Sequence, residues 1–485
     1  MQTRPIALWL TLLAPAALTA GCAAGPDFVR PAAPSAAEGY APTPAPAASQ
    51  PQAVLGEGPQ ARWWQAFGSP DLDALVDRAL AGNPGLEAAN ATLARANAHS
   101  AVIAGRRLPQ VDANARVEHE EVNFASFGFP GANPTFTLYS VGGGVSYDPD
   151  LWGKNRRALE QARAQGEAQL HETEAAHLAL AGKVVSDYLL IATLRDAIAT
   201  QQALIAESAR NLSLTRARQN AGSGTLVEVL SAQAQLSADE GDLPTLHQNL
   251  AEARDLLATL LGITPAELGT TDYSLAQIHL PASVPVSLPS ALVHHRPDIL
   301  TAEARLHAAI AGIGVAQASL YPNITLGGSI EQASSATASL FSGSFRGFDL
   351  FGGISAPIFH GGSLRAAHRG AKAEAQAAAA SYRETVFSAF AQVSDLLSGL
   401  STDAQSLDSA RQTASLAEQS LTLSRKSFEV GNSGILQVLD ANRAYQRASI
   451  GLLSAQSRQY ITVARLYVAT AGGWTGPAAP PKTPS

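Results

Sequence analysis

The chain has 485 residues, of which 46% are hydrophobic, 15% are charged and 6% are aromatic, and its formal net charge is −7. A chain of this length and hydrophobic content can form a large core. The acidic balance and the absence of clustered Lys and Arg exclude the basic surface that nucleic-acid binding requires. Beyond the N-terminal region no run of eighteen apolar residues occurs, so the sequence predicts no membrane-spanning helix.

The first 21 residues are typical of an export signal that ends before the only cysteine. Arg4 provides the positive start, residues 6–18 are apolar, and small residues lead to Cys22. This ending is similar to a bacterial lipoprotein signal, although Leu18 lies one position further from the cysteine than that motif prefers. Cys22 is therefore predicted to carry diacylglycerol and an N-acyl group. Alternatively, the signal is an ordinary secretory one and Cys22 is incidental.

Two segments rich in proline are expected to lie outside the folded body. Residues 22–62 combine Pro, Ala and Gln, a composition that predicts an extended tether from the lipid anchor. Residues 475–485 are also rich in proline and are predicted to be a disordered tail. The folded body is accordingly expected between residues 63 and 474.

The folded body has an internal two-fold sequence repeat. The stretch Leu212–Gly222 recurs as Leu421–Gly431, and the residues that follow each copy also match. Such a repeat predicts two structural units of one plan, residues 63–270 and 271–474. Each is expected to contain a helix, two strands, a very long helix, a tight turn and a second long helix.

Apolar residues that recur every seventh position predict the long helices. The first repeat should contain helices at about 154–220 and 226–261, and the second at about 364–430 and 435–471. A sustained seven-residue period predicts antiparallel helices in left-handed coiled coils. At 1.5 Å per residue the longest would extend roughly 100 Å, which exceeds an ordinary globular domain. The recurring residues of the ascending helices are Val184, Ile191, Ile198, Ile205 and Leu212, then Val386, Val393, Leu400, Leu407, Ala414 and Leu421.

Each ascending helix is expected to stop at a glycine, Gly222 or Gly431. Glycine readily adopts the left-handed conformation that ends a helix, so both positions are predicted to be hairpin tips. Two matching tips at one end of a rod form a candidate docking or gating surface, although each is also explained as a simple turn.

Strand signals precede the long helices, at about 110–148 and 322–358. Val111, Ala113 and Ala115 alternate with polar residues, which predicts one apolar and one polar face. Two hairpins give four strands, too few to close a membrane barrel, and open edges are not tolerated in lipid. Strands that span a membrane would therefore require several copies of the chain, and three copies would give twelve strands. Alternatively, the hairpins are soluble sheets.

Motifs of enzyme chemistry are absent from the sequence. It contains no G-x-x-x-x-G-K-[ST] loop, no G-x-S-x-G elbow and no H-E-x-x-H pair, and its eleven histidines are scattered. No catalytic residue, metal site or cofactor-binding residue is predicted.

Over nearly its whole mature length the chain resembles the outer-membrane factor family of TolC-like proteins, most closely the lipoprotein branch of resistance-nodulation-division efflux systems. Many motifs match in the same order, which makes the resemblance specific. They include Gly25-Pro26-Asp27-Phe28, Trp63-Trp64, Asn83-Pro84, Asp150-Leu151-Trp152-Gly153, Arg296-Pro297-Asp298-Ile299, Tyr321-Pro322, Pro357-Ile358-Phe359, Val438-Leu439-Asp440-Ala441 and Gly472-Gly473-Trp474.

The resemblance implies a mainly helical fold with a β-barrel portion and a homotrimeric assembly. Twelve strands would form one outer-membrane barrel, in contact with outer-membrane lipid, and the long helices would form a periplasmic α-barrel. The implied function is the exit duct of a tripartite efflux pump, passively conducting drugs or other small molecules. Its implied partners are a periplasmic adaptor protein and an inner-membrane resistance-nodulation-division transporter.

The resemblance also places the closing tips at Gly222 and Gly431 and acidic residues of the constriction at Glu228 and Asp440. Gln437 stands where some relatives carry a further Asp. Rings of carboxylates across a narrow bore favour cations. Both acids also lie near a helix N-terminus, where carboxylates are favoured without any role in gating.

Two other functions fit the same elements: a lipid-tethered periplasmic coiled-coil scaffold, and the outer-membrane duct of a type I secretion system. Surface labelling of a cysteine at Phe127, in the predicted loop between the first two strands, would succeed in intact cells only for a channel.

Overall fold

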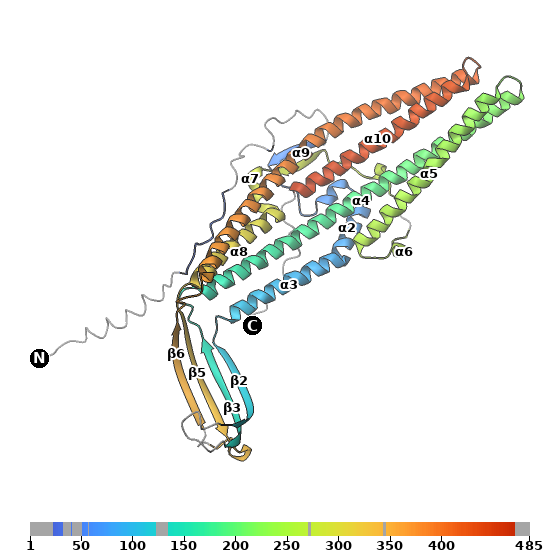
Figure 1. Cartoon of the computed structure of the whole chain (residues 1–485). Coiled ribbons are helices and arrows are strands. Elements are labelled where there is room, and N and C mark those ends of the chain that lie inside the picture. Colours follow the sequence, from blue (N-terminus) through green and yellow to red (C-terminus); the bar gives the residue numbers. More distant parts are fainter. Residues whose placement is uncertain are drawn as a thin grey trace. The chain divides into compact units, whose positions relative to one another are not determined.

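The computed structural model describes residues 23–32, 40, 51–56, 58–122, 134–269, 273–342 and 346–470 (Figure 1). The predicted lipidation site Cys22, the signal 1–21, Phe127 and the tail 475–485 lie outside these residues. The chain divides into two compact units. Unit 1 comprises Met1–Pro31, Thr92–Gln169 and Thr301–Tyr382, and unit 2 comprises Ala32–Ala91, Leu170–Leu300 and Arg383–Ser485.

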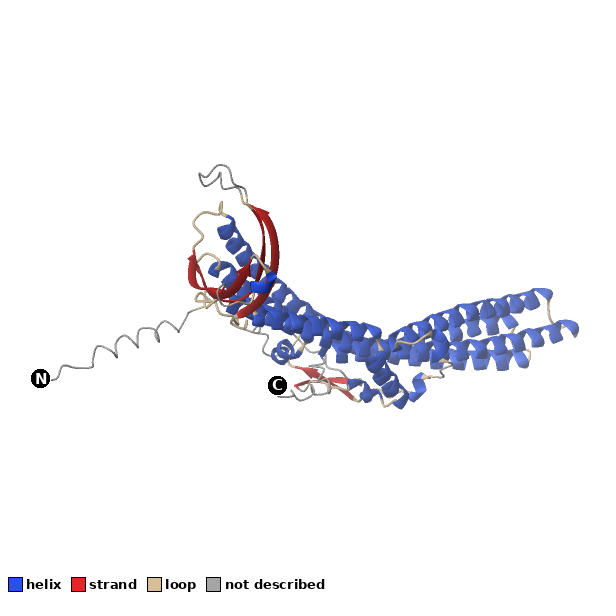
Figure 2. Ribbon diagram, turned by 90° about the horizontal axis from the view of Figure 1, so that it is seen from below, coloured by secondary structure: helices blue, strands red, loops and turns tan. Residues whose placement is uncertain are grey.

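Unit 1 contains a four-stranded antiparallel sheet. Its strands are β2 (Gln110–Glu121), β3 (Thr135–Tyr147), β5 (Asn323–Ser334) and β6 (Arg346–Ser355), in the order β2-β3-β5-β6. The two predicted hairpins therefore form one sheet, because β3 of the first pairs with β5 of the second. The sheet is curved (Figure 2), and β2 and β6 are its edges. A short 3-10 helix, η4 (Thr337–Ser339), lies between β5 and β6.

The helices of the two halves have equal lengths. Helices α3 (Pro84–Gly105) and α8 (Pro297–Ala318) have 22 residues each. The long helices α4 (Lys154–Asn220) and α9 (Ser363–Glu429) have 67 each, and α5 (Leu226–Leu261) and α10 (Ile435–Thr470) have 36 each. The ends of all four long helices fall within one residue of the positions expected from the heptads. Of the recurring heptad residues of the ascending helices, all except Ile205 are buried.

Aromatic side chains form the core of unit 2 beside the long helices. The 3-10 helix η1 (Trp63–Phe67) buries both tryptophans and the phenylalanine, and the ring centroids of Trp63 and Tyr467 are 5.6 Å apart. Gly68, in the left-handed conformation, ends η1, and Ser69 then caps α2 (Pro70–Gly82) and lies 2.9 Å from the hydroxyl of Tyr188. Unit 2 also contains the short helices α6 (Pro265–Leu268), η3 (Leu275–Gln277) and α7 (Pro289–His295).

The segment that follows Cys22 is packed against unit 1 rather than extended away from it. The guanidinium of Arg157, on α4, is buried and donates hydrogen bonds to the carbonyls of Ala24 and Gly25 and to the Asp27 carboxylate. A Cβ added at Gly25 would lie 2.5 Å from the Cα of Gly314 on α8, so only glycine permits this approach. These contacts order the start of the predicted tether 22–62.

A second part of the predicted tether belongs to unit 2. Residues Gln52–Gly56 form strand β1, which pairs in parallel with β4 (Ser283–Ser287). The Tyr40 hydroxyl also donates a hydrogen bond of 2.6 Å to the carbonyl of Ser287. The proline-rich composition predicted an extended backbone, and an extended backbone supplies the N–H and C=O groups that a neighbouring strand can pair with.

Two helices, α4 and α8, contain windows of 18 residues whose length and composition would allow them to cross a membrane. Half of each window is buried inside the protein, and core helices of soluble proteins meet the same criteria. Packing inside the protein therefore explains the apolar composition of α4 and α8.

One buried carboxylate in unit 2 has no hydrogen-bond partner among the described residues. Asp187, on α4, is 4% exposed, and neither of its carboxylate oxygens accepts a hydrogen bond. Burial raises the pKa of this carboxyl from its ordinary value of 3.8 to about 7. The unfolded chain then releases the proton at a lower pH than the folded chain, so the contribution of Asp187 to stability falls as pH rises from about 4 to about 7.

We expect Asp187→Asn to remove this pH dependence, because the amide cannot ionise. From pH 5 to pH 8 the unfolding free energy of the wild type should fall by on the order of 1–3 kcal/mol more than that of the variant. The measurement is the urea midpoint for loss of helical circular dichroism across this pH range. Asp242→Asn, at an exposed position of α5, is the control and should retain the wild-type profile. Parallel pH profiles for wild type and Asp187→Asn would contradict the prediction.

Candidate channel wall and hairpin tips

One face of the four-stranded sheet is apolar over the part of each strand that lies nearest the helices of unit 1, and polar residues take over toward the other end. Directly opposite residues of antiparallel strands point to the same face. The register therefore aligns Ala113, Gly143, Ile330 and Phe348 in one row across all four strands. Many of these side chains are exposed, Phe348 to 79% and Leu350 to 82%. The apolar face comprises Val111, Ala113, Ala115, Val117, Tyr139, Val141, Gly143, Val145, Tyr147, Ile324, Leu326, Gly328, Ile330, Phe348, Leu350, Gly352 and Ile354, and it continues into His119, Glu121, Thr135, Thr137, Gln332, Ser334 and Arg346.

The opposite face of the same sheet is polar. Its rows include Asp112, Gly144, Ser329 and Asp349, in which the Ser329 hydroxyl donates to the Asp349 carboxylate. The polar face comprises Gln110, Asp112, Asn114, Arg116, Glu118, Glu120, Ser140, Gly142, Gly144, Ser146, Asn323, Thr325, Gly327, Ser329, Glu331, Gly347, Asp349, Phe351, Gly353 and Ser355, with the apolar residues Phe136, Leu138 and Ala333 toward one end. A sheet with one apolar and one polar face separates two media, and strands exposing apolar residues to one side are typical of membrane barrels.

Both edges of this sheet are open among the described strands. Strand β2 pairs only with β3, and strand β6 pairs only with β5. Each edge therefore presents unpaired backbone N–H and C=O groups along 12 or 10 residues. A single copy of the sheet cannot lie in hydrocarbon with these groups exposed.

The two predicted tips have the same backbone structure. Gly222 follows α4 with φ +77°, and Gly431 follows α9 with φ +81°. In each turn the glycine N–H donates to the carbonyl three residues earlier, and the next N–H donates to the carbonyl five residues earlier. This arrangement satisfies carbonyls at a helix C-terminus and requires the left-handed conformation that glycine accepts without strain.

The predicted acidic residues lie near the starts of the descending helices. Glu228 forms a capping box with Thr225, whose backbone N–H donates a hydrogen bond of 2.7 Å to the Glu228 carboxylate. The Asp440 side chain is 78% exposed and lies 3.4 Å from a guanidinium nitrogen of Arg443. The first tip approaches the second here, since a Cβ added at Gly434 would lie 3.9 Å from a carboxylate oxygen of Glu228.

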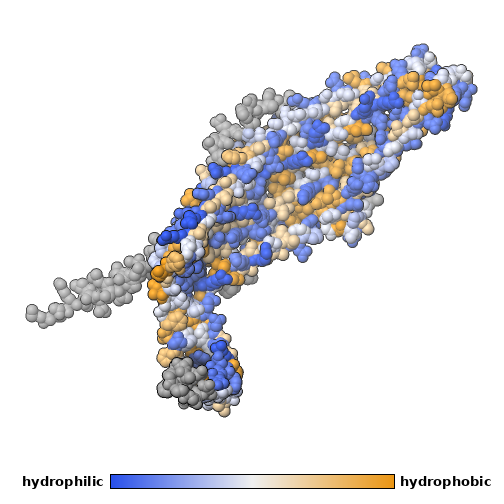
Figure 3. Space-filling view, in the orientation of Figure 1, coloured by the Kyte–Doolittle hydropathy of each residue, from blue (hydrophilic) through white to orange (hydrophobic). Residues whose placement is uncertain are grey.

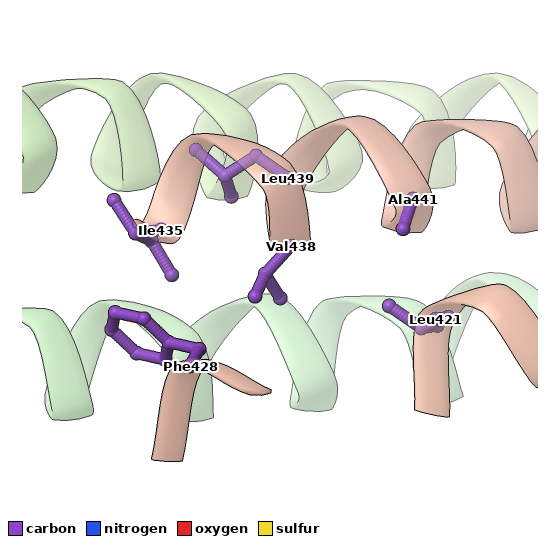
Figure 4. Packing of buried hydrophobic residues seen from close by; sticks show 6 residues of the cluster. All are labelled: Leu421, Phe428, Ile435, Val438, Leu439 and Ala441. Carbon is purple, nitrogen blue, oxygen red and sulfur yellow. The ribbon is translucent and has the colours of Figure 1, made fainter. Parts of the chain in front are cut away.

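Sequence reasoning did not identify a contact that joins the two hairpins. The guanidinium of Arg218, at the end of α4, donates a hydrogen bond of 3.0 Å to the carbonyl of Phe428, at the end of α9. Its central carbon also lies 4.4 Å from the centroid of the Phe428 ring, a cation–π geometry. Phe428 is buried in a cluster with Leu421, Ile435, Val438, Leu439 and Ala441 (Figure 4).

The sequence did carry a signal for this contact. In the aligned repeats, Ser427 stands at the position of Arg218 and Gln219 stands at the position of Phe428. Both partners of the contact are thus places where the two copies differ. A contact between two similar but non-identical hairpins must depend on such positions.

Further polar contacts tie the hairpins together below the tips. Arg425 on α9 forms an ion pair of 3.1 Å with Glu207 on α4. Closer to the centre of unit 2, the Asn442 amide on α10 donates to the Ser208 hydroxyl, and both side chains are fully buried. The Asp239 carboxylate accepts from the same hydroxyl. Buried polar groups of this kind specify the register of packed helices.

Apolar side chains are exposed beside these turns. Figure 3 shows a hydrophobic area at the end of the hairpins. The exposed large apolar side chains next to the two turns are Leu226, Val227, Leu230, Val430 and Leu436, each more than half exposed. Exposed apolar groups that gather at one place are typical of an interaction surface.

A family model described as "Outer membrane efflux protein" matches the chain over residues 75–263 and 288–472. A pyoverdine export outer membrane protein, OpmQ of Pseudomonas putida, is 32% identical over 437 residues, which cover 88% of this chain and 91% of that protein. The outer membrane protein OprJ of Pseudomonas aeruginosa is 29% identical over 462 residues, covering 94% of each chain.

Solved structures agree with the sequence comparisons. The outer-membrane channel OprN superposes with a TM-score of 0.83 at 29% identity, covering 93% of this chain and all of that chain. The open state of the outer membrane channel MtrE of Neisseria gonorrhoeae superposes with a TM-score of 0.81 at 26% identity, covering 93% of this chain and 99% of the other. The chain therefore belongs to the outer membrane efflux protein family and is an outer-membrane efflux channel.

Proposed function

We propose that three copies of this chain assemble into one exit duct of a tripartite efflux pump. The observation that carries the proposal is the four-stranded sheet with one apolar face, one polar face and two open edges. Pairing β6 of each copy with β2 of the next satisfies every edge, and three sheets of four strands close a barrel of twelve. The apolar face then contacts lipid and the polar face lines the lumen.

In this assembly the long helices continue the duct into the periplasm, and the lipid on Cys22 adds a second attachment to the membrane. The packed segment after Cys22 supports this arrangement, because Arg157 fixes Ala24 and Gly25, two and three residues from the acylated cysteine. Curated relatives named for the export of pyoverdine, toluene and antibiotics favour small molecules as cargo, rather than the proteins of a type I secretion system.

The hairpin tips form the periplasmic entrance and its gate. The exposed apolar residues at the tips would contact a periplasmic adaptor protein, which in turn connects the duct to an inner-membrane resistance-nodulation-division transporter. The contact between Arg218 and Phe428 holds the two hairpins of each copy together and so favours the closed state. Glu228 and Asp440, near the starts of α5 and α10, supply negative charge close to the bore.

Cysteines on the two edge strands test the shared barrel. We expect Ala115→Cys on β2, combined with Leu350→Cys or Ile354→Cys on β6, to give covalent dimers and trimers on oxidation. All three positions lie on the apolar face, and pairing between copies brings opposite residues within about 5.5 Å. Single-cysteine variants are the controls and should not give covalent trimers. The shared barrel would be contradicted if both double-cysteine variants remained monomeric after oxidation in outer-membrane vesicles.

The tip contact is tested by Arg218→Ala. Loss of a hydrogen bond and a cation–π contact should raise the ratio of open to closed molecules about tenfold. The measurement is the open probability of single channels in planar bilayers. Arg411→Ala is the matched control, because Arg411 on α9 is exposed and forms its ion pair with Asp408 on its own helix. An equal effect of both substitutions would argue that the loss of a positive charge, and not the loss of this contact, controls opening.

Asp440→Ala tests the acidic residues. Removing three carboxylates from the proposed entrance should lower the preference of the channel for K⁺ over Cl⁻, because carboxylates around a narrow bore attract cations. The reversal potential in a KCl gradient measures the preference. Asp242→Asn serves as the control for loss of an exposed acid elsewhere on a helix. Selectivity identical to the wild type would remove Asp440 from the gate and leave the channel assignment intact.

A further inference from the structure

The polar face of the sheet contains a hollow of about 310 Å³. It is lined by Asp112 and Asn114 on β2, by Ser146 on β3, by Ser329 and Glu331 on β5, and by Phe351 on β6. All of these residues belong to the polar face, and all lie in unit 1. The hollow thus draws side chains from all four strands.

Gly143 and Gly144 on β3 and Gly328 on β5 belong to the lining of this hollow, and Gly142 lies next to Gly143 in the chain. Gly144 stands between Asp112 and Ser329 in one row, and Gly142 stands between Asn114 and Glu331 in the next. A Cβ at Gly142 would lie 2.8 Å from the carbonyl oxygen of Ile330, so this position has no room for a side chain. The central strand therefore leaves backbone exposed between carboxylates on either side.

The aromatic wall of the hollow is Phe351. A Cβ at Gly327, directly opposite on β5, would lie 2.4 Å from the Cζ of Phe351, so the ring lies over that glycine. The ring nevertheless remains 53% exposed. An aromatic ring packed over a strand glycine is held in place, and its free face is available to a ligand.

The charge around the hollow is negative. Asp112 and Glu331 form no ion pair among the described residues. A third carboxylate, that of Asp349 on β6, accepts a hydrogen bond from the Ser329 hydroxyl on β5. The one cation on the polar face of the described strands, Arg116, lies 3.6 Å from the Glu118 carboxylate and is not part of the lining. Carboxylates beside an exposed aromatic ring complement a positively charged group that carries an apolar part.

We propose that this hollow is a binding station for organic cations with an apolar or aromatic part. The proposal rests on the proposed function, in which the polar face lines the lumen and three copies place three such hollows around it. The Asp112 and Glu331 carboxylates attract the cationic group, and the ring of Phe351 contacts both the cation and its apolar substituent. The station is shallow and open, which suits conduction, because a site in a duct must release what it binds.

Channel block by benzyltrimethylammonium tests this station, with benzenesulfonate as an anionic probe of similar size. Each is added during a K⁺ current in planar bilayers to channels whose only change is Arg218→Ala, which makes the tip open more often. We expect benzyltrimethylammonium to block and benzenesulfonate not to block. Phe351→Leu should weaken the block about three- to tenfold, and Asp112→Asn with Glu331→Gln should weaken it at least as much.

Two controls separate a binding station from a general effect. Asp242→Asn removes one acid outside the sheet and should leave the block unchanged. Tetramethylammonium lacks the aromatic part, so its block should be weaker than that of benzyltrimethylammonium and should respond less to Phe351→Leu.

Conducting channels in which the block is unaffected by both sets of substitutions, or in which both probes block equally, would overturn the station while leaving the duct in place. Protein that forms no channels would overturn the duct and the station together. The Phe351→Leu channels must retain wild-type K⁺ conductance, which shows that the barrel is intact.

Discussion

The satisfaction of backbone hydrogen bonds in lipid is the constraint on which the rest of this structure depends. A sheet with β2 and β6 as open edges cannot stay in hydrocarbon alone, because each unpaired N–H or C=O group costs several kcal/mol. The same chain has one sheet face with exposed Phe348, Leu350 and Ile354, which water would not favour. The proposed edge pairing between copies would satisfy both demands at once.

Periodicity predicted the long elements well, because burial repeats with the geometry of a helix or a strand. The heptads placed the ends of all four long helices to within one residue, and nearly all the recurring residues are buried. Alternation from Val111 onward likewise separated the apolar from the polar face of β2. Periodicity did not show that Tyr147 of the first hairpin stands opposite Leu326 of the second, because register depends on contacts distant in sequence.

Composition was a poorer guide than periodicity at the N-terminus. A segment rich in Pro and Ala reads as a tether, yet Ala24 and Gly25 are held by a buried arginine and Gln52–Gly56 pairs with a strand more than 200 residues away. In each case the partner, Arg157 or Ser283–Ser287, lies far along the chain, and local composition carries no information about it. At the tips the glycines were visible as repeat positions, whereas the capping role of Glu228 depends on the backbone geometry of Thr225.

The differences between the two halves carry as much function as their similarity. The contact of Arg218 with Phe428 joins the two hairpins through residues that have no counterpart in the other copy, because Ser427 and Gln219 stand at the matching positions. The sheet shows the same principle, because Phe351 on β6 has no aromatic equivalent at Ser140, Gly142 or Gly144 on β3. Duplication supplies the frame of paired helices and strands, and divergence places single charged or aromatic residues on it. In such a protein the positions at which the repeat fails are therefore the first places to look for gating and selectivity.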